Sequence, residues 1–238
     1  MAIRSQPIVL TIFGNFACWT RPECKVERLS YPVPTPGGMR GFLNAIYCKP
    51  EEFYWQVDKI EILNPIEYIG LKTNEVKRKM PRIPKKITKE MLQDFLIDIE
   101  ADRTQRQTIA LKNVKYRVTA HLVLQPTATV NISRVYEQAI RRIGRGQAFF
   151  QPSLGLREFE GYFELGSDGK QPISDSSDIG LMLYDTFEPY RIQGDPSVSL
   201  FRAEMVDGVV SIPPYESPQV LKSENACSGE SEVDYNAQ

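Results

Sequence analysis

The residue best suited to acid–base chemistry in this 238-residue chain is its only histidine, His121. It lies near the end of an alternating segment, TIALKNVKYRVTAHLVL, in which Lys115, Arg117 and Thr119 fall on the same face. Metal-free RNA cleavage requires a base for the 2′-hydroxyl, an acid for the leaving 5′-oxygen and positive charge beside the phosphate. A histidine suits the first two roles because its pKa lies near neutrality. A lone histidine on a strand is more often structural, and the residues alone leave both interpretations open.

A second candidate site is the loop RRIGRGQAFFQP, residues 141–152. Its glycines allow a backbone to approach a phosphate closely, its arginines supply charge and its aromatic rings can stack on bases. A flexible hairpin with solvated arginines explains the same composition equally well. The residues that we expect to bind RNA in this region are Arg141, Arg142, Gly144, Arg145, Gly146, Phe149 and Arg157.

Several classes of enzyme are excluded by missing motifs. The chain contains no GxSxG, P-loop, GxGxxG or HExxH sequence. Its four cysteines form no CxxC pair, and with one histidine we expect neither a metal site nor a cofactor. No apolar run approaches the ~20 residues that span a bilayer, and the N-terminus does not resemble a signal peptide. We therefore expect a cytoplasmic protein with reduced thiols and no membrane association.

Charge is unevenly distributed along the chain, although the net charge is only −1. Basic residues gather in segments 72–90 and 134–157, which is typical of a face that binds a polyanion. Segment 72–90 taken alone is more simply a solvated loop. The stretch 219–238 is rich in Ser, Glu and Asn, which predicts a disordered tail.

The segment SYPVPTPGGMRGFLNAIYCKP, residues 30–50, predicts a helix over 36–47 with a strong start signal. Thr35 can cap the helix, and Pro36 suits its first position. Arg40, Asn44 and Tyr47 share a stripe that faces away from the core. The apolar stripe that we expect to be buried is Met39, Phe42, Leu43 and Ile46.

The order of elements predicts the fold class. The sequence predicts, in order, a strand, a helix, a strand, a polar and basic insertion at 72–107, a strand with a bend near Asn113, a helix at 131–143, a glycine loop and a strand. This split βαβ pattern is typical of an α+β, ferredoxin-like or RRM-like domain, which we expect over residues 1–165. A small β-rich region should cover 166–218, with Asp207-Gly208 as a hairpin turn.

The stretch from Leu10 to Ile66, the loop with FQPSLGLREF and the later MVDGVVSIP together resemble the CRISPR-associated Cas-five proteins of type I-C, the subtype with the suffix d. The similarity runs from about 8 to 213, and SYPVPTPGGMRGFLNAIYCKP is its most specific part. The resemblance implies a RAMP-type protein with a ferredoxin-like core and a β-rich C-terminal part. It further implies metal-independent cleavage of the repeat hairpin of precursor CRISPR RNA, through attack of the 2′-hydroxyl to give a 2′,3′-cyclic phosphate. The protein would then stay on the 5′ handle within the Cascade surveillance complex.

The family's catalytic set of tyrosine, lysine and histidine is carried over residue by residue. Its tyrosine matches Tyr47, and its histidine matches His121 in the pair Ala120-His121. Some relatives carry the lysine just before the pair that ends in this histidine, where this chain has Thr119, so Lys112 or Lys115 from the same strand would substitute. We assign the lysine role to Lys115, because it shares the histidine's face. Arg40 and Arg117 join the expected RNA-binding residues.

Two functions remain open at this point. Tyr47 and His121 together favour the nuclease, whereas the missing lysine favours a non-catalytic subunit that only binds the 5′ handle. The partners expected in either case are the CRISPR RNA, the Cas-seven-type backbone and Cas-eight-type large subunits, and target DNA indirectly through the complex.

Overall fold

The structure is a computed structural model that describes residues 3–24, 26–77, 98–190 and 196–222. Within these residues the strands form one sheet with the path β10-β8-β9-β3-β5-β1-β6, to which β2, β4 and β7 attach. The helices are α1 (Pro36–Ile46), α3 (Ile99–Asp102) and α4 (Ile132–Gly144). The strands are β1 (Ile8–Ala17), β2 (Arg28–Leu29), β3 (Phe53–Ile62), β4 (Tyr68–Val76), β5 (Arg103–Leu124), β6 (Tyr162–Leu165), β7 (Ser177–Asp185), β8 (Ser199–Val206), β9 (Val209–Ser211) and β10 (Val220–Lys222).

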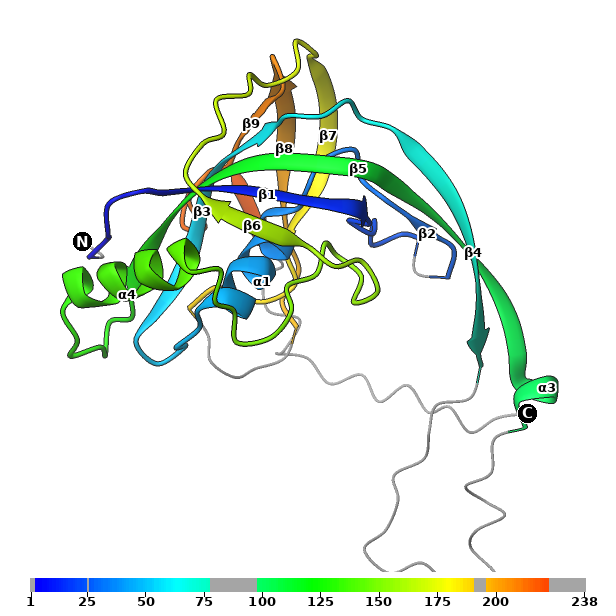
Figure 1. Cartoon of the computed structure of the whole chain (residues 1–238), viewed down its shortest axis with the longest axis horizontal. Coiled ribbons are helices and arrows are strands. Elements are labelled where there is room, and N and C mark those ends of the chain that lie inside the picture. Colours follow the sequence, from blue (N-terminus) through cyan, green and yellow to red (C-terminus); the bar gives the residue numbers. More distant parts are fainter. Residues whose placement is uncertain (1–2, 25, 78–97, 191–195, 223–238) are drawn as a thin grey trace, which may run out of the picture.

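The centre of the sheet is the antiparallel set β3-β5-β1-β6. Helix α1 follows β1 and α4 follows β5, and both helices lie below these strands in Figure 1. The predicted order of strand, helix, strand, strand, helix and strand is present as β1, α1, β3, β5, α4 and β6, and β2, β4 and α3 are additional to it. The molecule is a mixed α/β protein dominated by an antiparallel sheet.

Strand β5 connects the two parts of the sheet. It runs for 22 residues and turns at Asn113, whose φ of 51° is rare for a residue other than glycine. One edge of β5 pairs with β1, while the other pairs with β3 near its C-terminal end and with β4 near its N-terminal end. The bend predicted near Asn113 lets one strand serve both parts of the sheet.

The predicted insertion 72–107 begins and ends inside strands. Residues 72–76 belong to β4 and residues 103–107 to β5, which pair with each other in an extended arm (Figure 1). Residues 78–97 of the insertion lie outside the described residues, and the short α3 directly precedes β5. Segments 72–76 and 103–107 consist almost entirely of polar residues and pair with each other, so they lack the alternation that would have predicted strands.

The C-terminal β-rich region continues the same sheet. Strand β9 pairs with β3, and the turn between β8 and β9 places Asp207 and Gly208 at positive φ, as their sequence predicts. The prediction that disorder begins at 219 is wrong at its start, because β10 pairs with β8 and buries Val220. Residues 223–238 of the predicted tail lie outside the described residues.

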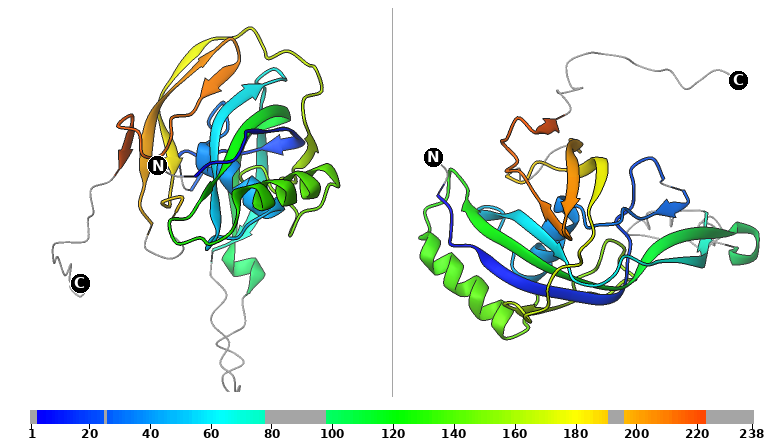
Figure 2. Two further views of the ribbon diagram at one scale, coloured as in Figure 1. Left: turned by 90° about the vertical axis from the view of Figure 1, so that its left-hand side faces the viewer. Right: turned by 90° about the horizontal axis from the view of Figure 1, so that it is seen from above.

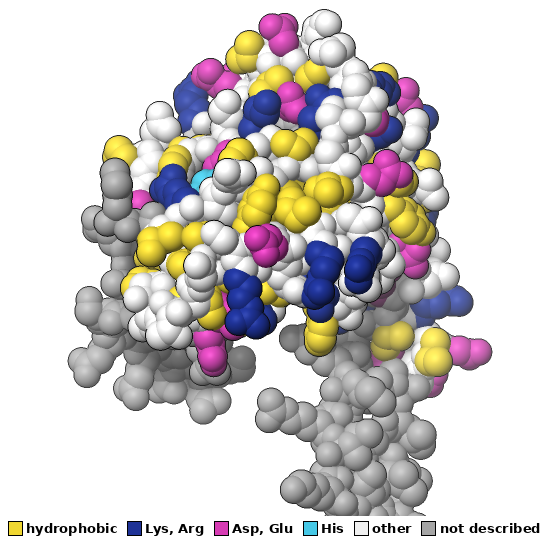
Figure 3. Space-filling model, turned by 60° about the vertical axis from the view of Figure 1, so that its left-hand side comes forward, with side chains coloured by type: hydrophobic (Ala, Val, Ile, Leu, Met, Phe, Trp, Pro, Cys, Tyr) yellow, Lys and Arg dark blue, Asp and Glu magenta, His cyan; other side chains and the backbone are white. Residues whose placement is uncertain are grey.

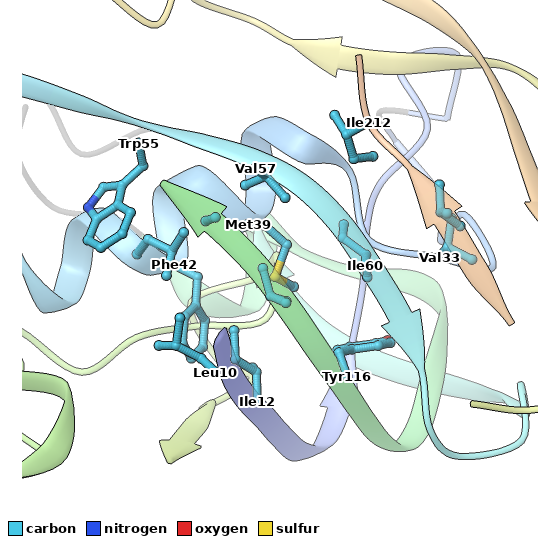
Figure 4. Packing of buried hydrophobic residues seen from close by; sticks show 14 of the residues in the cluster. Leu10, Ile12, Val33, Met39, Phe42, Trp55, Val57, Ile60, Tyr116 and Ile212 are labelled. Carbon is cyan, nitrogen blue, oxygen red and sulfur yellow. The ribbon is translucent and has the colours of Figure 1, made fainter. Parts of the chain in front are cut away.

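Helix α1 lies between the central strands and the β7–β8 pair (Figure 2). Its predicted apolar stripe is buried in one hydrophobic cluster, and Figure 4 shows Met39 and Phe42 among residues of β1, β3 and β5. Ile212, from the C-terminal region, belongs to the same cluster. Described residues from Ile8 to Val220 therefore contribute to a single core.

The glycines at the start of α1 make room for neighbours within the molecule. A Cβ at Gly37 would lie 2.6 Å from Cγ of Asp185, and one at Gly38 would lie 2.8 Å from the ring of Trp19. Thr35 caps the helix by accepting a hydrogen bond from the amide of Gly38. These two glycines thus let the first turn of the helix pack against β7 and the Trp19 ring.

None of the helices in the described residues is both long enough and apolar enough to cross a membrane.

Candidate functional site

His121 forms a hydrogen bond with a carboxylate that the sequence did not indicate. Its Nδ1 lies 2.7 Å from Oδ2 of Asp58, a residue of β3. The side chain is buried, with 7 % of the residue exposed, and its Nε2 has no hydrogen-bond partner among the described residues. One ring nitrogen is thus held by an acidic group, while the other is buried with its hydrogen-bonding capacity unused by the described residues.

Tyr47 ends α1 as its C-cap and lies beside a basic cavity. Its ring packs on Phe53 with centroids 4.9 Å apart, and the Arg142 guanidinium lies 5.5 Å from its centre. Burial raises the pKa of the Tyr47 hydroxyl, an effect that the nearby Lys49 opposes. The cavity beside the ring has a volume of about 350 Å³ and is lined by Tyr47, Lys49, Glu52, Val130, Arg134, Val135, Gln138 and Arg142.

Tyr47 and His121 lie on opposite faces of the sheet. Gln56 is paired with His121 and Phe53 with Leu124, so Phe53 and Gln56, three residues apart, point to opposite sides. The Tyr47 ring lies on the Phe53 side. Phe53 and Gln56, the β3 residues next to the two proposed catalytic groups, are also separated by about 10 Å along the strand, at ~3.3 Å per residue.

Lys115 and Arg117 share the face of His121, as predicted, but both are engaged in ion pairs. Lys115 Nζ lies 2.6 Å from Asp168, and Arg117 lies 3.3 Å from both Glu61 and Asp168. The bond to Lys115 lowers the pKa of the Asp168 carboxyl to about 2. Lys115 stands six residues from His121, about 20 Å along an extended strand, so the two cannot contact one phosphate in this conformation.

Arg40 forms an ion pair within the fold. Its guanidinium forms two contacts of 2.7 Å with Oδ2 of Asp185, at the end of β7. Only 17 % of the Arg40 side chain and 5 % of that of Asp185 are exposed. The arginine that we expected to hold RNA links α1 to the C-terminal strands.

The glycine loop contains most of the accessible basic groups among the predicted residues. Arg141, Arg145 and Arg157 are exposed, as are Gly144 and Gly146. Phe149 and Phe150 are 80 % and 59 % exposed and meet edge to face. Arg142 instead turns inward, donating to the carbonyl of Ile46.

The surface in Figure 3 carries separate Lys and Arg side chains along its lower edge, with hydrophobic side chains above them. On this face the basic side chains therefore stand apart and do not form one compact patch.

Three residues near the predicted site escaped the sequence analysis. Asp58 meets His121 because of a β-bulge, and Arg134 reaches the Tyr47 cavity from the first turns of α4. Lys49 also lines this cavity. It lies only two residues after Tyr47, but nothing in the sequence singled it out. Among the described residues no group of three or more His, Cys, Asp or Glu side chains could hold a metal ion.

Comparison with known proteins defines the class to which this arrangement belongs. A family model described as CRISPR-associated protein (Cas_Cas5) matches residues 8–213, a span that includes Tyr47, Lys115 and His121. The chain is therefore a CRISPR-associated protein. More particularly, it belongs to the Cas5d family.

Two curated relatives are each named CRISPR pre-crRNA endoribonuclease Cas5d. The one from Mannheimia succiniciproducens is 38 % identical over 226 residues, covering 90 % of this chain and 98 % of its own. The one from Thermus thermophilus is 36 % identical over 229 residues, covering 90 % and 94 %.

Two solved structures share the fold. A CRISPR-associated protein superposes with a TM-score of 0.65 at 20 % identity, over 92 % of this chain and 98 % of that one. A functionally uncharacterized protein from Streptococcus mutans superposes with a TM-score of 0.64 at 19 % identity and the same coverage.

Proposed function

We propose that this chain is an endoribonuclease that cleaves the repeat hairpin of precursor CRISPR RNA without a metal ion. The observation that carries the proposal is the identity of 36–38 % to two named pre-crRNA endoribonucleases over 90 % of the chain. After cleavage the protein stays on the 5′ handle, as a cytoplasmic subunit of a type I-C Cascade complex. Its neighbours there are backbone subunits of the Cas-seven type and a large subunit of the Cas-eight type, which bring it indirectly to target DNA.

The order β3-β5-β1-β6, with a helix after β1 and another after β5, supports assignment of residues 1–165 to a ferredoxin-like, RAMP-type domain. We assign residues 166–218 to a C-terminal β-rich region that shares its sheet.

The proposed reaction is transesterification. The RNA 2′-oxygen bonds to the neighbouring phosphorus, the bond from phosphorus to the 5′-oxygen breaks, and a 2′,3′-cyclic phosphate and a 5′-hydroxyl result. His121 acts as general acid or base through Nε2, which has no partner in the part of the chain that the structure describes, and Tyr47 positions the 2′-hydroxyl. Lys115 supplies positive charge once RNA displaces Asp168.

We further propose that the RNA backbone crosses the exposed end of α4 and the glycine loop. Arg141, Arg145 and Arg157 contact phosphates, and Phe149 stacks on a base. Gly144 and Gly146 keep this approach clear of side chains, since a Cβ at Gly146 would meet nothing within 4 Å and one at Gly144 only a methyl group of Leu165 at 3.6 Å. Arg142 lines the basic cavity beside Tyr47.

A specific observation favours the rival function, a subunit that binds the 5′ handle without cleaving. Tyr47 and His121 occupy opposite sheet faces, and Lys115 lies about 20 Å from the histidine along the strand. A binding subunit would not need these groups to meet.

One experiment separates the two functions. The pure protein is incubated with a labelled repeat hairpin in EDTA, alongside His121→Ala, Tyr47→Phe and the control Tyr68→Phe, which changes an exposed tyrosine of β4. The nuclease is supported if the first two variants bind normally but cleave at least ~10²-fold more slowly, the usual value of an acid–base group. Tight binding by the unaltered protein with no cleavage would establish the rival.

A further inference from the structure

The contact between Asp58 and His121 is produced by an irregularity in the sheet. The register runs from Val57 opposite Ala120 directly to Lys59 opposite Thr119, so Asp58 is the extra residue of a β-bulge. Its carbonyl accepts a hydrogen bond from the amide of Ile212, which anchors the bulge to the chain segment after β9. A bulge redirects a side chain, and this one directs a carboxylate to the Nδ1 of His121 at 2.7 Å.

The chemistry of the two groups determines which of them carries the hydrogen of this hydrogen bond. An ionised carboxylate can only accept a hydrogen bond, so Nδ1 must be the donor. A neutral imidazole has one hydrogen, and its Nε2 then carries a lone pair. That nitrogen is buried without a partner among the described residues, so its capacity to take a proton is not used by the fold.

We propose that Asp58 is a positioning residue, which holds His121 in the tautomer with hydrogen on Nδ1 and aims Nε2 for proton exchange with the RNA. The proposal rests on the catalytic role of His121 proposed above. In the reaction Nε2 takes the proton of the 2′-hydroxyl as that oxygen bonds to phosphorus and the bond to the 5′-oxygen breaks. The leaving oxygen takes its proton from water, and the Asp58 carboxylate stabilises the imidazolium that forms.

The tautomer can be read directly in the unaltered protein. His121 is the only histidine, so the imidazole signals in a long-range ¹H–¹⁵N spectrum belong to it without assignment. At a pH where the ring is neutral we expect the shift of a protonated nitrogen at Nδ1 and of an unprotonated one at Nε2. The opposite pattern in the full chain would overturn the proposal without any variant.

The variant Asp58→Asn tests the functional consequence. The amide it introduces can donate to Nδ1, which allows the tautomer with hydrogen on Nε2. We expect that tautomer to appear and single-turnover cleavage to fall by ~10²–10⁴-fold, as for an aspartate that orients a catalytic histidine, with hairpin affinity changed less than about twofold. The control Asp178→Asn removes a carboxylate of β7 that pairs with Arg202, and should alter neither readout.

The outcomes separate this proposal from the proposed function. Full cleavage by Asp58→Asn, with slow cleavage by His121→Ala, refutes positioning and leaves the nuclease intact. Full cleavage by His121→Ala refutes the catalytic histidine and the positioning role with it, whichever tautomer is seen. If Asp58→Asn melts at a much lower temperature, the spectrum of the unaltered protein remains the deciding measurement.

Discussion

At the scale of single residues, Arg40 shows how a basic side chain can serve the fold. Replacing it with methionine, which keeps most of its apolar stem, leaves the buried Asp185 carboxylate without its cation. We expect Arg40→Met to lower the free energy of unfolding by ~3 kcal/mol in urea denaturation, because an unpaired charge remains in the interior. The double variant Arg40→Met, Asp185→Asn should lose less free energy of unfolding than Arg40→Met alone.

The matched control is Arg202→Met, which breaks an exposed ion pair on β8 and should cost no more than about 0.5 kcal/mol. If Arg40→Met unfolds like the unaltered protein but binds the hairpin weakly, the RNA-binding role expected from the sequence is correct.

Asp168 is a second residue whose behaviour the structure predicts. Lys115 and Arg117 lower the pKa of its carboxyl to about 2, against ~3.9 for an unperturbed aspartate. A depressed pKa stabilises the folded state above pH ~4, and that contribution is lost as the pH falls toward 2. A ¹³C carboxyl NMR titration should show the low midpoint, and Lys115→Met should raise it. A midpoint near 4 in the unaltered protein would show that the ion pair does not persist in solution.

At the scale of elements, two glycines of α1 make a matched pair. Gly37 faces Asp185, where a Cβ would lie 2.6 Å from Cγ, whereas a Cβ at Gly41 would meet nothing within 4 Å. We expect Gly37→Ala to destabilise the protein by ~1–3 kcal/mol through crowding. Gly41→Ala should stabilise it by ~0.5–1 kcal/mol, because alanine favours the helix. Urea denaturation of both variants measures these changes, and equal effects would contradict the packing of α1 on β7.

At the scale of the whole molecule, the continuous sheet predicts joint unfolding of its two regions. Strand β9 pairs with β3, and Phe201 and Ile212 lie in the same core as α1. We therefore expect amides of β3 and β8 to exchange through one global opening, with the same free energy in denaturant-dependent hydrogen exchange. Exchange of β8 at a clearly lower free energy would show that 166–218 unfolds as a separate unit.

The salt dependence of RNA affinity should increase with the number of phosphates that the protein contacts. Each lost contact to a single strand lowers the slope of log affinity against log salt by ~0.7. We expect Arg141→Ala and Arg145→Ala each to reduce the slope by this amount, measured by filter binding between low and physiological salt. Arg202→Ala on β8 is the control, and an equal loss there would mean that the effect is one of total charge.

The sequence by itself determined the elements and much of the core. Helix α1, its buried stripe, the bend at Asn113 and the turn at Asp207-Gly208 were all predicted, and the structure has them. These features depend on local backbone preferences and on the spacing of apolar residues, which a single sequence displays. The resemblance to the family likewise depended on motifs read in order along the chain.

The tertiary structure alone decided which charges meet. Three pairs of residues that are far apart in sequence lie in contact: Asp58 with His121, Asp168 with Lys115, and Asp185 with Arg40. Only the strand register, a bulge and the curvature of the sheet bring the members of each pair together. Periodicity assigns a side chain to a face of its own strand but not to a partner on another. For that reason the sequence placed Lys115, Arg117 and His121 correctly on one face, yet could not predict that ion pairs would occupy both cations. Nor could it predict that Nε2 of the histidine would have no partner among the described residues.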